Sequence, residues 1–158
     1  MLSNIGTILL ILTLILSFAT IYSSFSNLKK KNNVIKNKIY NFALYQTTLS
    51  ITGFFVLVLG FIISDFSLIN VFENSHTSKP MFYKISGAWG SHEGSLLLWI
   101  NILIIFSFLF LVYNKDKNTV FRLYTLIFQN FIISGFLIFL LFNSNPFSIV
   151  HPIPLEGM

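Results

Sequence analysis

The chain has 158 residues, of which 54% are hydrophobic and only 9% are charged, whereas ordinary soluble domains carry about 25% charged residues. This composition excludes a water-soluble globular protein, and the absence of cysteine excludes disulfide scaffolds, thiolate zinc sites and CxxCH haem attachment on this chain. The net charge of +5 rests on few residues and is read first as a signal of membrane topology, so nucleic acid is not an expected partner.

Four stretches are long and apolar enough to cross a bilayer. Spanning the hydrocarbon core takes roughly 20 apolar residues in a helix, because only internal hydrogen bonds satisfy the backbone in lipid. The stretches contain no proline and no ionised side chain, and they lie at about 5–25, 42–64, 95–113 and 123–142. The first lacks the basic start and the cleavage pattern of a signal peptide. The sequence therefore predicts an all-α integral membrane protein, a single module over 1–158 with about four transmembrane helices in two hairpins.

The charged residues assign the connections to the two sides of the membrane. Basic residues gather in the first and third connections, at Lys29, Lys30, Lys31, Lys36, Lys38, Lys115, Lys117 and Arg122. The second connection, 65–94, is about 30 residues long and balances two lysines with three acids. By the positive-inside rule, we expect this loop and the tail 143–158 to face the outer side. The prolines of the tail predict an extended segment that packs against something else.

Polar residues within the spans are uncharged amides and hydroxyls. We expect Gln46, Ser50, Asn101 and Asn130 to form hydrogen bonds between helices. A proton or ion path would need carboxylates, lysines or histidines inside the membrane. The spans contain none, which disfavours a pump or a proton-coupled transporter.

A polar, glycine-punctuated run leads directly into the third span. It reads Trp-Gly-Ser-His-Glu-Gly-Ser-Leu-Leu-Leu-Trp over 89–99. Ser91 fits a helix N-cap, and Glu93 falls in the first turn, where the helix dipole stabilises a carboxylate by about 0.3 to 1 kcal/mol. A helix extending back to residue 89 would place four residues on one face: Trp89, His92, Leu96 and Trp99. Such a face offers a stacking surface for a flat amphipathic ligand such as haem, with His92 as iron ligand or propionate partner.

Structural roles explain the same side chains. Trp89 and Trp99 fit ordinary anchors at the membrane–water interface, and His92 fits a structural polar network with Glu93. His76 and His151 have no metal-ligand spacing and are expected to be exposed. The residue pattern predicts no metal site.

The small residues of the run suggest a contact surface. Gly90 and Gly94 would let another backbone or a flat ligand approach closely. Together with Glu93 and Ser95 they form a candidate interface. Upstream, Pro80 suits the start of a short helix at the membrane surface.

The run over 89–99, preceded by Tyr-Lys-Ile-Ser-Gly-Ala, closely resembles the signature at the third transmembrane helix of the CcmF family. These proteins are the cytochrome c haem lyases of the system I maturation pathway. Further matching residues precede the run, at Asp65-Phe66-Ser67, Asn74-Ser75 and Pro80. Ser-Asn-Pro-Phe at 144–147 resembles the SNPF of the family after the fourth helix. The resemblance covers about residues 40 to 147 in collinear order.

The resemblance implies one part of a larger haem-lyase bundle. A full family member has many more helices, and its haem-presenting and haem-ligating segments come after the point where this sequence stops. We therefore expect the N-terminal module of a split haem lyase, completed by other chains, with no catalytic residue here and haem only in the assembled complex. Nineteen phenylalanines and many Ile, Asn and Lys residues are typical of an organellar gene or of an AT-rich bacterial gene. This favours the mitochondrial inner membrane, or the plasma membrane if the source is bacterial.

The expected function is that of a membrane scaffold that helps to present haem for thioether attachment to the CxxCH motif of apocytochrome c. The implied partners are the remaining haem-lyase polypeptides, other haem-maturation membrane proteins, apocytochrome c and the lipid bilayer. The alternative is a non-catalytic structural subunit of a large inner-membrane respiratory complex, with respiratory-complex subunits as partners. Co-purifying proteins distinguish the two.

Overall fold

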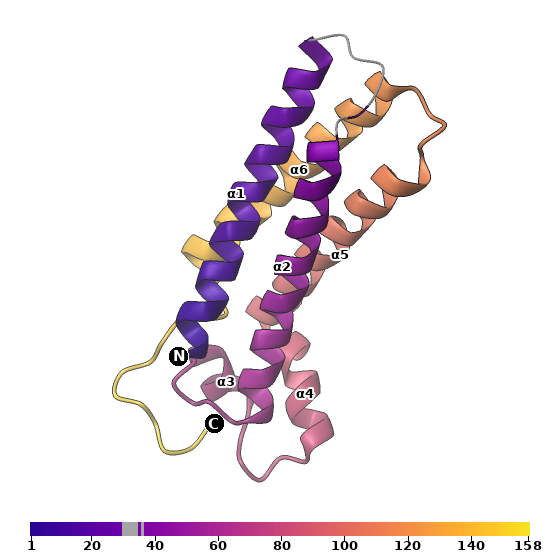
Figure 1. Ribbon diagram of the computed structural model, residues 1–158. Helices are drawn as coiled ribbons and strands as arrows, with labels where there is room; N and C mark the ends of the chain where they lie inside the picture. Colours follow the sequence, from indigo (N-terminus) through magenta and orange to yellow (C-terminus); the bar gives the residue numbers. More distant parts are fainter. Residues whose placement is uncertain (30–34, 36) are drawn as a thin grey trace.

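The computed structural model describes residues 1–29, 35 and 37–158 (Figure 1). Four long helices form a bundle: α1 (Leu2–Lys29), α2 (Asn37–Ile62), α5 (His92–Tyr113) and α6 (Thr119–Asn143). Two short helices, α3 (Ile69–Asn74) and α4 (Met81–Gly90), occupy the connection between α2 and α5. All four long helices are long and apolar enough to cross a membrane. The predicted all-α membrane fold with four spans is confirmed.

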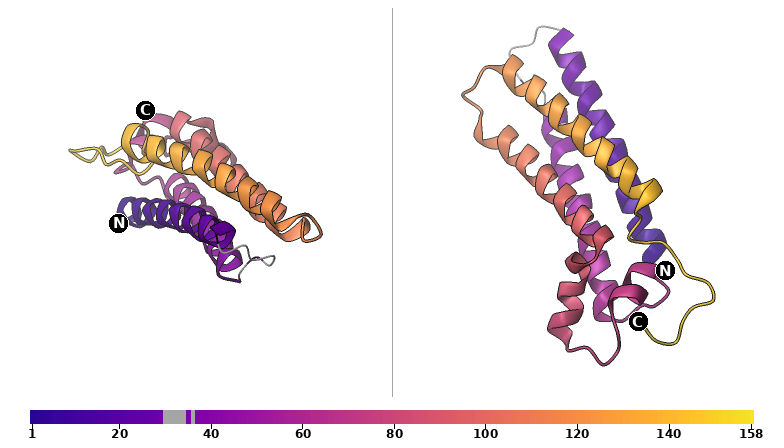
Figure 2. Two further views of the ribbon diagram at one scale, coloured as in Figure 1. Left: turned by 90° about the horizontal axis from the view of Figure 1, so that it is seen from above. Right: turned by 180° about the vertical axis from the view of Figure 1, so that it is seen from behind.

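The two hairpins pack face to face. The first hairpin is α1–α2 and the second is α5–α6; α1 packs against α2 and α6, while α5 packs against the same two helices (Figures 1 and 2). Both termini, α3 and α4 lie at one end of the bundle, called here the α4 end, and the α5–α6 connection lies at the other. Leu10, Leu57, Leu97 and Leu137 contribute one fully buried leucine from each long helix. The core therefore draws on all four spans.

The second span ends two residues earlier than predicted. Helix α2 stops at Ile62, and Ser64 takes a positive φ of 56°. This left-handed residue allows Asp65 N–H to bond to the Gly60 carbonyl at 2.9 Å, and Ser64 N–H to bond to the Phe61 carbonyl at 3.3 Å. Such a closure satisfies the last carbonyls of a helix and turns the chain away from its axis.

Small and hydroxyl residues face inward on α1. Its buried positions include Thr13, Ser17 and Thr20, whereas its large apolar side chains, such as Ile15 and Phe18, are about half exposed. Thr13 and Thr20 donate to carbonyls one turn back, at 2.7 and 2.8 Å. This polarity is opposite to that of a soluble amphipathic helix, because lipid covers the outside and close packing needs small residues inside.

Three of the four predicted positions, Ser50, Asn101 and Asn130, take part in hydrogen bonds between helices. Ser50 Oγ on α2 donates to Asn101 Oδ1 on α5 at 3.0 Å, and Ser17 Oγ on α1 donates to the Asn130 carbonyl on α6 at 2.9 Å. Gln46 differs from the prediction, because its Nε2 is buried without a hydrogen-bond partner within the described part of the chain.

Arg122 lies inside the bundle rather than in a solvated loop. Its side chain is only 4% exposed. One guanidinium nitrogen, Nη2, donates to the Leu111 carbonyl at 2.6 Å and to the Tyr40 hydroxyl at 2.9 Å. Charge-assisted bonds of this kind are about twice as strong as neutral ones. Arg122 thus joins α6 to the end of α5 and to the start of α2.

The tail folds back onto its own chain. Phe147 is 1% exposed and lies against Gly6 of α1, and Ser3 Oγ donates to the Phe147 carbonyl at 2.6 Å. Ile149 forms an antiparallel bridge with Leu68. The start of the tail therefore packs against α1 and against the loop that follows α2, whereas most residues of the proline-containing end, 151–156, are exposed.

The end of the tail contacts the outer loop a second time. Glu156 Oε1 accepts from the Thr77 N–H at 2.9 Å and from its hydroxyl at 2.6 Å. The side-chain hydrogen bond from Thr77 is the largest cause that holds the pKa of the Glu156 carboxyl below its usual value. His76 Nδ1 lies 3.6 Å from the same carboxylate oxygen. His76, expected to be exposed, is thus half-buried and lies beside an acid, whereas His151 is exposed as expected.

Candidate functional site

The polar run over 89–99 forms a sharp corner between two helices, and Ser91 is the corner residue. Its backbone N–H bonds to the Gly87 carbonyl at 3.2 Å and ends α4. Its hydroxyl accepts from Gly94 N–H at 3.1 Å and caps α5. Ser91 is 2% exposed. The predicted N-cap is confirmed, because the side chain satisfies an otherwise unpaired N–H of the first turn.

Gly94 makes the corner sterically feasible. A Cβ at this position would overlap the Ala88 carbonyl oxygen of α4 and lie 2.7 Å from Ser91 Oγ. Ala88 itself is fully buried. The close backbone approach at Gly94 is therefore made by α4 of the same chain. At Gly90, by contrast, a Cβ would meet nothing within 4 Å, so this glycine leaves open space at the surface.

The helix does not extend back to Trp89. Because Ser91 is extended, with φ −78° and ψ 157°, Trp89 belongs to α4 and does not follow the helical spacing of α5. The predicted four-residue face is corrected to three residues of α5: His92, Leu96 and Trp99. Trp89 is 43% exposed and Trp99 is 69% exposed, as amphipathic rings at a membrane interface can be.

His92, Glu93 and Ser95 occupy the first turn of α5. His92 is exposed and Glu93 is half-buried, at the position where a helix dipole favours a carboxylate. Ser95 Oγ donates to the His92 carbonyl at 2.9 Å. Among the residues of known placement, no ion pair to Glu93 and no hydrogen bond between the His92 and Glu93 side chains is present. The predicted polar network between His92 and Glu93 is therefore not formed among the described residues.

Two contacts position α4 beside the end of α2. A Cβ on Gly87 would lie 2.9 Å from the Phe61 ring, so this glycine lets α4 pack closely on α2. Lys84 Nζ donates to Ser64 Oγ at 2.8 Å. Helix α4 begins at Met81, with Pro80 as its N-cap, which confirms the predicted start. Its Phe82 is 79% exposed, consistent with a helix lying at the membrane surface.

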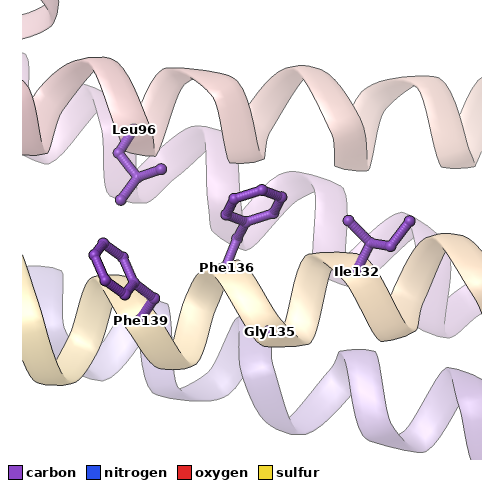
Figure 3. Close-up of a pocket in the computed structure, with 5 residues that line it drawn as sticks. All are labelled: Leu96, Ile132, Gly135, Phe136 and Phe139. Atoms are coloured by element: carbon purple, nitrogen blue, oxygen red, sulfur yellow. The ribbon is translucent and has the colours of Figure 1, made fainter.

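An apolar cavity opens beside the α5 face. Its volume is about 400 Å³, and it is lined by Leu96 of α5 and by Ile132, Gly135, Phe136 and Phe139 of α6 (Figure 3). None of the lining side chains can ligate a metal or pair with a carboxylate. No group of three histidine, cysteine or acidic residues gathers anywhere in residues 1–29, 35 and 37–158. The described residues do not by themselves fit a haem group, since His92 offers one exposed imidazole and the adjacent cavity supplies no partner for a propionate.

Several residues that stabilise the α4 end of the bundle carry little signal in the sequence. Ala88, Phe147 and Gly6 are apolar, and although Ala88 and Phe147 lie in segments that resemble the CcmF family, no packing role follows from those segments. A usable signal exists only for Phe147, because Asn145-Pro146 marks a turn and the next residue can be directed back onto α1. Asn145 Oδ1 does accept from Phe147 N–H at 3.0 Å.

The chain is similar to cytochrome c biogenesis proteins in both sequence and fold. It is 44% identical over 115 residues to the cytochrome c-type biogenesis protein CycK of Bradyrhizobium diazoefficiens, covering 73% of this chain and 17% of that protein. It is 32% identical over 157 residues to NrfE of Haemophilus influenzae, covering 99% of this chain and 25% of that protein. A solved structure described as cytochrome c heme lyase CcmF matches the fold with a TM-score of 0.84 at 19% identity.

These matches cover the chain far more completely than they cover the relatives. The CcmF structure is matched over 94% of this chain but over only 25% of its own length. No family model matches. The chain thus spans about a sixth to a quarter of the length of its relatives. Within that span, these 158 residues belong to the CcmF/CycK/Ccl1 family of cytochrome c biogenesis proteins.

Proposed function

We propose that the chain is the N-terminal scaffold of a cytochrome c haem lyase of system I, completed by other polypeptides. One observation carries this proposal: a four-helix unit with a TM-score of 0.84 to CcmF corresponds to only a quarter of that protein. The remaining three quarters of that protein's length correspond to no part of these 158 residues. The chain supplies part of the membrane bundle, and it supplies no catalytic residue.

The outer corner is the part of the chain that we place nearest to haem in the complex. Trp89, His92 and Trp99 are exposed there, and Gly90 leaves space beside them. Haem supplies vinyl groups that react with the two thiols of CxxCH in apocytochrome c. In this proposal the exposed rings border the haem site, and Ser91 and Gly94 keep the corner rigid. Glu93 and Ser95, in the first turn of α5, lie at the interface with the partner chains.

We assign the α4 end to the intermembrane space, or to the periplasm in a bacterium, with the multi-pass chain in the mitochondrial inner membrane or the bacterial plasma membrane. Asp116, Lys115 and Lys117 would then face the matrix or cytoplasm. Because the chain has no native cysteine, single cysteines report their side of the membrane without background. Glu73 and Asp116 are both exposed acids at opposite ends of the bundle and form a matched pair.

We expect Glu73→Cys to react with a membrane-impermeant maleimide in intact mitoplasts or spheroplasts, and Asp116→Cys to react only after the membrane is permeabilised. The measurement is gel-shift labelling of the two variants in parallel. The reverse pattern of labelling would invert the assigned topology.

The proposed function is tested by native purification. The tagged chain, extracted in mild detergent, should co-purify with polypeptides that complete a haem lyase, identified by mass spectrometry, and with a haem absorption band. The chain expressed alone should lack that band, and His92→Ala should reduce recovery of the complex more than it shifts the haem spectrum. Recovery of oxidase or dehydrogenase subunits instead would support the respiratory-complex alternative, and a haem band from the isolated chain that is lost in His92→Ala would make His92 a ligand.

A further inference from the structure

We propose that the apolar groove between α5 and α6 is the docking site for one transmembrane helix from the part of the haem lyase that lies outside these 158 residues. This inference rests on the proposed function and names the surface through which the scaffold is completed. Leu96 of α5 forms one wall of the groove (Figure 3). Ile132, Phe136 and Phe139 of α6 form the other, and Gly135 lies among them.

Gly135 has no packing role within the described chain. A Cβ there would meet nothing within 4 Å. Gly6 and Gly60 differ, since a Cβ on Gly6 would overlap the Phe147 ring and one on Gly60 would lie 3.0 Å from Leu68. Glycine weakens a helix relative to alanine. The small residue at position 135 therefore serves a contact that these residues do not make.

The preceding turns of α6 carry an apolar hollow of their own. A second apolar cavity of about 300 Å³ is lined by Ile127, Phe128 and Phe131. Phe128, Phe131, Gly135 and Phe139 follow one another at three- and four-residue spacings, so they lie on one face of α6. The eleven helical steps from Phe128 to Phe139 rise about 16 Å, which is about three turns and long enough to accommodate a packed helix.

The chemistry of the groove favours a helix over the other membrane components. Its lining contains no charged or hydrogen-bonding side chain, so it offers nothing to a lipid phosphate or to the propionates of haem. Helices associate in lipid where a small residue lets two backbones approach and larger side chains pack around the contact. A glycine between phenylalanines provides this arrangement.

The length of the matched structure indicates where such a helix would come from. The CcmF structure matches this chain closely but continues for three quarters of its length beyond the match. In the proposed complex, part of that remainder packs on an outer face of the four-helix unit. Gly135 lies in the wall of an apolar cavity on such an outer face, and a Cβ there would meet nothing within 4 Å.

The proposal is tested with Gly135→Trp, which fills the groove, and Leu59→Trp, which adds bulk to a half-exposed position on α2. Each tagged variant is purified from native membranes, and the co-purifying haem-lyase polypeptides are quantified. We expect about tenfold lower recovery for Gly135→Trp and unchanged recovery for Leu59→Trp. Thermal unfolding of each chain alone should match wild type, because the Gly135 side of α6 is open. Normal recovery with Gly135→Trp, or equal loss in both variants, would overturn the docking site.

A photo-crosslinking residue at Phe139 gives a second measurement that does not depend on the folding of a tryptophan variant. Illumination of intact membranes should link Phe139 to an apolar helix peptide of the haem lyase outside residues 1–158. Adducts with lipid only, or with another protein, would contradict the proposal. If wild type recovers no haem-lyase polypeptide at all, the proposed function itself fails; if wild type recovers them and only the groove tests fail, the proposed function stands and this surface is wrong.

Discussion

Replacing Gly94 with alanine is expected to destabilise the corner between α4 and α5. The added Cβ would overlap the carbonyl oxygen of Ala88 and crowd the hydroxyl of Ser91, so α4 must shift or the N-cap must break. Overpacking in a close-packed interior costs about 1 to 3 kcal/mol, and loss of an N-cap costs about 1 kcal/mol. We expect the free energy of unfolding to fall by an amount near the upper end of this range. The lowered midpoint of thermal unfolding in detergent micelles measures this change.

Gly90→Ala is the matched control four residues upstream. Neither glycine has a positive φ, so alanine suits both backbones, and at Gly90 a Cβ meets nothing within 4 Å. Surface substitutions of this kind change stability by less than about 0.5 kcal/mol. An unfolding midpoint of Gly94→Ala equal to that of the wild type would show that the corner is not tightly packed. Wild-type stability of Gly90→Ala together with reduced recovery of the complex would identify Gly90 as an external contact.

Truncating Phe147 to alanine is expected to release the tail from the bundle. The ring is 1% exposed and fills the space beside Gly6, and removal of a buried phenylalanine side chain costs about 3 to 5 kcal/mol. Because the Leu68–Ile149 bridge and the Thr77–Glu156 hydrogen bonds lie further along the tail, they should weaken as well. Hydrogen exchange at residues 148–158, followed by mass spectrometry in detergent, reports the release.

Phe142→Ala controls for the loss of a phenylalanine side chain in the same region. Phe142 is 81% exposed, so its truncation should leave both the unfolding midpoint and exchange in the tail close to wild type. Equal exchange in the Phe147→Ala and Phe142→Ala variants would contradict the anchoring role of Phe147.

Sequence patterns over short distances predicted the elements of this fold well. The four spans follow from apolar length alone, since an unpaired backbone is too costly in lipid. Ser91 as a cap and Pro80 as a helix start depend only on the next few residues. The signature over 89–99 likewise led to the family, because its identification requires residue order and no spatial contact.

The same local evidence left two readings of the corner open. A cap at Ser91 and a helix continuing back to Trp89 are mutually exclusive, yet both patterns are present in the sequence. The structure selects the cap because Gly94 can pack on the backbone at Ala88, a contact that gives the cap an advantage over a continuous helix. The position of Trp89 on α4 follows from that choice.

What the sequence by itself determined is the number of spans, their limits to within a few residues, and the family. Only the tertiary structure decided that Arg122 is buried, that Gly94 lies against Ala88 and that the tail covers the outer loop. The contact between Ser3 and Phe147 joins residues 144 positions apart, and that between Thr77 and Glu156 joins residues 79 apart. Helix formation depends on neighbours within one or two turns, whereas such contacts depend on how the two hairpins pack, which no local pattern encodes.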